Sequence, residues 1–287
     1  MESFITQFSH LDPILDQNPP RLVPAGPDNT VVTPAETKQL LKAYKERGFV
    51  EMDALGLPFA VQCAAAFSLG GAFSSNPLGV FTLTRCAADL LEAHGCDELK
   101  QFYLPKLRSA DWFGTMALSE SQAGSSLADI CTMATPVGEH EGAAPEYRIR
   151  GEKMWTSGAF HDLSDNIIHM LLARTPNSPP GAGGISLFLV PNVLKDGTRN
   201  DVELISLNRK MGHKALSNCA WSLGQATGGA VGYLVGEKNR GVQCMFGMMN
   251  AMVRVFVHLW LVAAARARFF DWAATDRWRQ DSASRWV

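Results

Sequence analysis

The sequence lacks several patterns that would assign a function directly. Its six cysteines form no CxxC pair and no compact cluster, which argues against a zinc site or a disulfide framework and favours reduced thiols. The GxGxxG, GxxxxGK(S/T), HExxH and GxSxG motifs of dinucleotide, P-loop, zincin and α/β-hydrolase proteins are missing. We therefore expect no metal site, and spacing alone indicates only an α+β protein.

Excess charge and long apolar runs are also missing. The 26 basic and 28 acidic residues leave a net charge of −2 without a basic cluster, so we expect no nucleic-acid partner. The longest apolar stretch, residues 255–265, is broken by His258 and falls short of the ~20 residues that span a bilayer. Because the first residues resemble neither a signal nor a transit peptide, we expect a cytoplasmic protein without an integral membrane segment.

The sequence does contain a clear change of period along the chain. Prolines interrupt residues 1–30, which we expect to form an irregular lead-in. Residues 31–112 have helical periodicity and predict an N-terminal helical domain. A typical helix start, Thr33-Pro34-Ala35-Glu36, opens this domain. Helices are predicted over residues 33–47, 59–70, 78–94 and 97–107.

Short runs with β character begin near Trp112 and predict a compact all-β domain over residues 113–230. After Gly241 the helical period returns, with methionines three or four residues apart, and residues 231–287 are predicted to begin a second helical domain. Such a stripe favours core packing over a ligand site. Strands are predicted over residues 113–118, 147–150, 166–174, 185–190, 202–207 and 220–224.

Two motifs resemble the flavin-binding segments of the acyl-CoA dehydrogenase family. Residues 116–126 read MALSESQAGSS, and residues 151–159 read GEKMWTSGA. With shorter matches the resemblance extends over residues 80–267 and is closest to a large bacterial branch that includes methylthiopropionyl-CoA dehydrogenases. It implies an α+β fold with an N-terminal helical domain, a central β-barrel domain and the start of a C-terminal helical bundle. The changes of period agree with this order.

The resemblance also implies a flavin oxidoreductase that uses FAD to dehydrogenate an acyl-CoA thioester between its α and β carbons. Trp155 matches the aromatic residue that packs on the flavin ring, and Ser157 matches a hydroxyl residue near the N5 and O4 edge. Leu118 and Ser119 match the strand end that hydrogen-bonds the ring. The implied cofactor-binding residues are Met116, Leu118, Ser119, Trp155 and Ser157.

Ser125 and Arg254 are the substrate-binding residues that the resemblance implies. The implied partners are an acyl-CoA substrate, an acceptor similar to electron-transfer flavoprotein, and further copies of the chain in a homo-oligomer. Taken singly, each residue has a structural alternative. Trp155 could be a barrel-core aromatic, Ser119 a strand-end cap, and Arg254 a packing or ion-pair residue.

Four residues depart from the family pattern. Ser126 replaces an aspartate, and Asp129 stands where the family has a very small residue. Leu216 and Asn218 align with a serine and a threonine, which removes two hydroxyl groups from a strand near the cofactor.

The carboxyl-terminal part departs as well. Family members extend well past the position of Arg268, and no carboxylate occurs between Asn239 and Phe270 to act as the catalytic glutamate. We therefore expect a C-terminally truncated chain with impaired activity and an unknown catalytic base. Two alternatives remain open: a non-catalytic member that binds flavin or CoA or serves in assembly, and an acyl-CoA oxidase.

Overall fold

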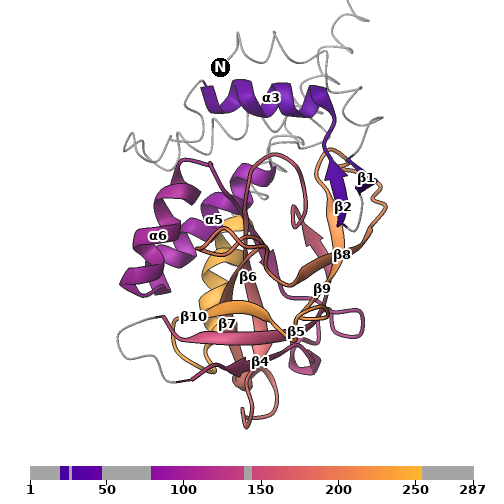
Figure 1. The fold of residues 1–287 in the computed structure, drawn as a ribbon. Helices are drawn as coiled ribbons and strands as arrows, with labels where there is room; N and C mark the ends of the chain where they lie inside the picture. Colours follow the sequence, from indigo (N-terminus) through magenta and orange to yellow (C-terminus); the bar gives the residue numbers. More distant parts are fainter. Residues whose placement is uncertain (1–19, 26–27, 47–78, 139–143, 254–287) are drawn as a thin grey trace, which may run out of the picture.

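A computed structural model describes residues 20–25, 28–46, 79–138 and 144–253 of the chain (Figure 1). Helices pack beside a mixed β-sheet, which confirms the α+β class. The helix predicted over residues 59–70 lies outside the described residues. Among the helices that the structure describes, none is both long and apolar enough to cross a membrane.

Three predicted helices are confirmed as α3 (Ala35–Glu46), α5 (Gly79–His94) and α6 (Asp97–Arg108). Another helix covers residues 241–253, and its Met245 and Met248 are buried in the same core as α5 and α6. The predicted packing role of the methionine stripe is therefore confirmed for these two residues.

Helix α5 packs directly against the first strand of the large sheet, β3 (Phe113–Ala117). The N–H of Gly114 donates a 2.9 Å hydrogen bond to the Thr84 hydroxyl. A Cβ atom at Gly114 would lie 2.6 Å from the Cβ of Ala87, so only glycine permits this close approach. The contact joins the N-terminal helices to the strand that leads into the first motif.

The last residues of the lead-in, for which the prolines suggest extended or irregular structure, are extended. Strands β1 (Arg21–Ala25) and β2 (Asp28–Val32) form an antiparallel hairpin. Pro24 suggested irregular structure, but a two-stranded ribbon accommodates proline because both of its strands are edges.

Eight strands form the large sheet, in the order β10-β7-β6-β4-β5-β9-β8, and β3 pairs with β6. Strand β10 also pairs with β5, so β10, β7, β6, β4 and β5 close into a ring. This closed ring is the predicted barrel. Besides β3, the strands are β4 (Met133–Pro136), β5 (Glu146–Ser157), β6 (Ile167–Arg174), β7 (Ile185–Pro191), β8 (Val202–Leu207), β9 (Asn218–Leu223) and β10 (Ala230–Val235).

Two strands of the ring, β4 and β10, escape sequence prediction. Strand β4 has only four residues, and β10 contains Gly232, which reads as a turn residue. That glycine leaves room inside the sheet for Ile149, because a Cβ atom there would lie 2.5 Å from the end of the Ile149 side chain, which would have to shift. The domain boundary predicted at residue 230 is therefore too early, since the sheet continues to Val235.

Candidate functional site

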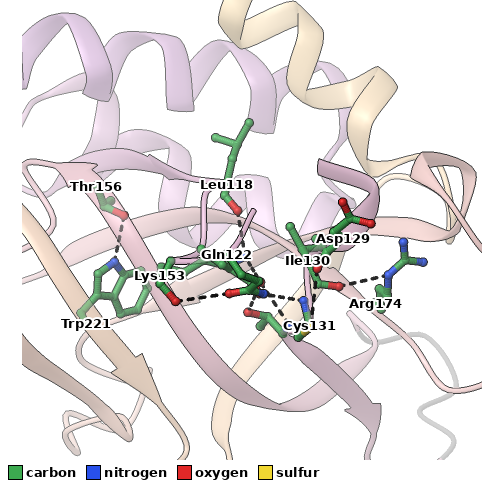
Figure 2. A network of polar contacts seen from close by, with 12 residues as sticks. Leu118, Gln122, Asp129, Ile130, Cys131, Lys153, Thr156, Arg174 and Trp221 are labelled. Carbon is green, nitrogen blue, oxygen red and sulfur yellow. Dashed lines mark hydrogen bonds and ion pairs between the residues drawn. The ribbon is translucent and has the colours of Figure 1, made fainter. Parts of the chain in front are cut away.

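The two motifs fold against each other where β3 ends beside the second half of β5. The N–H of Met154 donates a 2.9 Å hydrogen bond to the carbonyl oxygen of Ser119. The ammonium of Lys153 donates a 3.0 Å bond to the carbonyl oxygen of Leu118 (Figure 2). Segments more than 30 residues apart in the chain are thus held together by a side-chain bond from Lys153 and a backbone bond from the next residue, Met154.

A buried ion pair lies beneath this junction. Lys153 Nζ is 2.9 Å from Glu120 Oε1, and the side chains are 0% and 4% exposed. Glu120 also accepts hydrogen bonds from Thr132, Cys131 and Gln122. Burial alone would raise the pKa of Glu120, but the charge of Lys153 and these hydrogen bonds lower the pKa to about 2. The carboxylate therefore stays ionised and fixes both motifs.

Trp155 sits on a bulge in β5. The register between β5 and β9 shifts between Lys153 and Thr156, and Trp155 has a φ of 61° with a side chain that is 59% exposed. A left-handed backbone costs roughly 1–2 kcal/mol for an L-residue, and such strain clusters at functional sites. The alternative of a barrel-core aromatic is wrong for Trp155. The buried indole is Trp221, which donates a 3.0 Å hydrogen bond to the Thr156 hydroxyl (Figure 2).

Asn218, which lies opposite Ser157 on β9, holds the bulge from the neighbouring strand. Its Nδ2 donates to the Trp155 carbonyl at 3.2 Å and to the Ser157 hydroxyl at 3.1 Å. Its Oδ1 accepts a 2.8 Å hydrogen bond from Asn208. The sequence suggested only the loss of a hydroxyl here, whereas the structure shows an amide with three partners.

Several hydrogen-bond donors at this junction have no acceptor within the described part of the chain. They are the backbone N–H groups of Leu118 and Ser119 and the hydroxyl groups of Ser119 and Ser157. An exposed aromatic residue, Trp155, precedes Ser157 by two positions and follows Met154, whose N–H bonds to Ser119. This set of donors suits a planar ligand that carries carbonyl and ring-nitrogen acceptors.

The other predicted site residues are not among the donors of this junction, or they lie outside the described residues. Met116 pairs in register with Met170 and packs partly buried against the helical core. Ser125 is exposed on the loop that follows a tight turn between Glu120 and Ala123, and within the described ranges it makes no hydrogen bond to the junction. Arg254 is outside the described residues.

The loop that carries Ser125 is anchored by an arginine that sequence analysis overlooked. The Arg174 guanidinium donates to the carbonyl oxygen of Ile130 (Figure 2). It also donates to the carbonyl oxygens of Ala128, Pro179 and Gly181. Among the described residues, no three His, Cys, Asp or Glu side chains gather in a group that could hold a metal.

Comparison with known proteins identifies the family. The model of the acyl-CoA dehydrogenase middle domain matches residues 115–225, which include both motifs and Asn218. The chain is 38% identical over 235 residues to 3-methylmercaptopropionyl-CoA dehydrogenase of Ruegeria pomeroyi, covering 77% of this chain and 38% of that protein. It belongs to the acyl-CoA dehydrogenase family.

The chain is similar to other members of the acyl-CoA dehydrogenase family as well. Identity is 34% over 249 residues to the broad-specificity linear acyl-CoA dehydrogenase FadE5 of Mycobacterium tuberculosis, covering 82% of this chain and 39% of the relative. Sequence identity to a butyryl-CoA dehydrogenase of Syntrophomonas wolfei is 32% over 239 residues, covering 78% of this chain and 38% of the relative. The chain thus spans about two fifths of the length of these relatives.

Solved structures confirm the fold of the family. ACDH-11 of Caenorhabditis elegans in complex with C11-CoA superposes with a TM-score of 0.72 at 23% identity, covering 91% of this chain and 44% of that chain. An acyl-CoA dehydrogenase of Bacillus anthracis complexed with FAD superposes with a TM-score of 0.67 at 20% identity, covering 93% of this chain and 43% of that chain.

Proposed function

We propose that this chain supplies the flavin-holding part of an FAD-dependent acyl-CoA dehydrogenase. The observation that carries the proposal is the junction of the two motifs. There Leu118, Ser119 and Ser157 carry donors without an acceptor among the described residues, and the exposed Trp155 directly follows Met154, whose N–H bonds to Ser119. Family membership supplies the expectation that an isoalloxazine ring occupies this junction.

The donor set fits the acceptors of FAD. The N–H groups of Leu118 and Ser119, together with the Ser119 hydroxyl, would bond the carbonyl and nitrogen acceptors along the ring. The Ser157 hydroxyl would donate to the N5 and O4 edge. Trp155 would cover a face of the ring and keep water from it. When bound, FAD supplies the acceptor for the hydride that leaves the β carbon of an acyl-CoA.

The substrate class follows from the relatives. Their names specify acyl-CoA thioesters, and one structural neighbour holds C11-CoA. Ser125 and Arg254 stay our predictions for substrate contacts. An electron-transfer-flavoprotein-like acceptor, a homo-oligomeric state and a cytoplasmic location also stay predictions.

We further propose that turnover by this chain alone is slow. The α-proton must be removed by a base, and no carboxylate occurs between Asn239 and Phe270. Losing a positioned general base lowers rates by about 10²–10⁴. The chain is therefore expected to retain flavin more readily than it reduces it. The same observation motivates the second candidate function, a non-catalytic flavin-binding member of the family.

The test is the visible absorption of the purified chain after loading with FAD and gel filtration. Retained flavin supports the proposal, and a colourless chain overturns it. Trp155→Ala should lose flavin, whereas Phe102→Ala, which truncates a 39% exposed aromatic side chain on α6, should keep it. Bleaching on anaerobic addition of an acyl-CoA indicates dehydrogenation. Retained flavin that never bleaches favours the non-catalytic candidate.

A further inference from the structure

We propose that Asn218 is a positioning residue for the flavin, acting through Trp155 and Ser157. Its amide holds the left-handed bulge that presents the indole, and it directs the hydroxyl hydrogen of Ser157 toward the cofactor. This inference rests on the proposed function and adds to it a residue that the family pattern counts as a departure.

The orientation of the Asn218 amide follows from its partners. A backbone carbonyl oxygen can only accept, so the group 3.2 Å from the Trp155 carbonyl must be the NH₂ group. The second hydrogen of this NH₂ group is then available to the Ser157 hydroxyl at 3.1 Å. The remaining oxygen of Asn218 faces the amide of Asn208 at 2.8 Å, which must therefore present its own NH₂ group.

This arrangement decides which role the Ser157 hydroxyl can play. The oxygen already accepts a hydrogen from Asn218, so the hydroxyl's own hydrogen is left to donate. Within the described part of the chain it has no acceptor. Ser157 is thus prepared as a donor, and a donor beside the O4 carbonyl of the flavin would stabilise the electron density that reduction adds to the ring.

The same amide holds Trp155 in place. The backbone carbonyl of Trp155 bonds to Asn218 on β9, and the Thr156 hydroxyl accepts the indole N–H of Trp221 from the same strand. With Met154 bound to Ser119 on the other side, the strained residue is held at each neighbouring position. A left-handed tryptophan persists because its surroundings determine it.

The experiment compares FAD affinity and the midpoint potential of bound flavin in the full chain. Asn218→Asp is nearly isosteric but replaces the NH₂ donor with a second acceptor, so Ser157 would turn its hydrogen toward residue 218. We expect FAD to bind about tenfold more weakly, as the loss of one to two hydrogen bonds implies, and the potential to become more negative. Asn166→Asp is the matched control. It removes the amide donor of another buried asparagine, bound to Val193 beyond the far end of β3, and should leave both quantities unchanged.

A double-mutant cycle separates positioning from general damage. If Asn218 acts through the Ser157 hydroxyl, Asn218→Asp should shift the potential in the wild-type background but not in Ser157→Ala. Should Asn218→Asp fail to fold, Asn208→Ala removes the bond that holds the Asn218 oxygen, together with the weak 3.7 Å bond from the Asn208 amide to the Met154 sulfur. It should weaken FAD binding about two- to threefold, by loss of part of one hydrogen bond.

The outcomes distinguish this inference from the proposed function. A wild-type chain that binds no FAD overturns both. A wild-type chain that binds FAD while Asn218→Asp, or Asn208→Ala in its place, binds equally tightly at an unchanged potential overturns only the role of Asn218. An equal shift of potential in the Ser157→Ala background also overturns it. Weaker binding and a lower potential, confined to the background that keeps the serine, support it.

Discussion

The ammonium of Lys153 lies 2.9 Å from the carboxylate of Glu120, and both groups are removed from water. Each residue belongs to one of the two motifs, so the pair joins the end of β3 to the strand that carries Trp155. Charge pairing inside the sheet, together with backbone hydrogen bonds, therefore sets the distance between the segments that we assign to flavin.

Breaking this pair should strongly destabilise the fold. Lys153→Met leaves an uncompensated carboxylate, and removing one partner of a buried pair costs about 3–5 kcal/mol of unfolding free energy. Urea denaturation measures this change. Glu46→Gln breaks an exposed pair with Lys42 and should change stability by less than about 0.5 kcal/mol. Equal effects of the two variants would contradict the structural role of the buried pair.

Two substitutions of Trp155 should distinguish its effect on stability from its effect on flavin binding. Trp155→Ala and Trp155→Gly should both lose flavin, because neither has a ring. Glycine adopts a φ of 61° without steric cost, whereas alanine keeps the strain, so the glycine variant should be more stable than the alanine variant by about 1 kcal/mol. Denaturation of the two variants without FAD tests this difference. A less stable glycine variant would show that the left-handed backbone carries no strain.

Stability should fall in mild acid because of His169. This ring is fully buried, and its Nδ1 has no partner among the described residues. Burial lowers its pKa from 6.5 to about 4, although its Nε2–H donates a 2.7 Å hydrogen bond to the Asn192 side-chain oxygen. Between pH 6.5 and 4 the unfolded chain binds a proton at this histidine, whereas the folded chain does not. The contribution of His169 to the free energy of unfolding is therefore full above pH 6.5, and it declines by about 3 kcal/mol toward pH 4.

The acid decline can be assigned by substitution. His169→Gln should remove about half of the decline in unfolding free energy between pH 6.5 and 4.5, because burial also lowers the pKa of His161 to about 4. Combining His169→Gln with His161→Gln should flatten the curve, whereas His94→Gln, which changes an exposed ring, should leave it unaltered. The loss due to protonation of Glu120 begins only below its unfolded pKa of about 4.5 and extends toward 2, so it stays separate. A pH dependence that is as steep in His169→Gln as in the wild-type chain would exclude this histidine as a source.

Two glycines of one helix should respond in opposite ways to alanine. A Cβ atom at Gly241 would lie 2.3 Å from the backbone of Ser186 on β7, and overpacking costs about 1–3 kcal/mol. At Gly247 a Cβ atom meets nothing within 4 Å, and alanine stabilises an exposed helix position by about 0.5–1 kcal/mol. Thermal or urea denaturation should show Gly241→Ala to be less stable than wild type and Gly247→Ala more stable. The reverse order would mean that the helix does not start against β7.

Local patterns predicted the helices well and the sheet less well. Helices α5 and α6 end within one residue of their predicted positions because their apolar stripes and the glycine at residue 95 are local signals. Strand β10 carries no such signal. Its glycine is explained only by the side chain of Ile149, which the chain places beside it across more than 80 residues.

The candidate site divides in the same way. Ser119 and Trp155 stand in motifs that can be read along the chain, and the structure brings their segments together. The contribution of Asn218 arises from the register of β5 against β9, which joins residues 61 positions apart. No local pattern carries that information, so residue type alone suggested a lost hydroxyl.

The pairing of β10 with two other strands also limits where the chain can be shortened to make a stable fragment. Because β10 bonds to both β5 and β7, cutting the chain before Ala230 would leave two strands with unpaired N–H and C=O groups at once. Such exposed edges invite pairing with other copies and precipitation. A fragment intended for crystallisation or spectroscopy should therefore retain Val235.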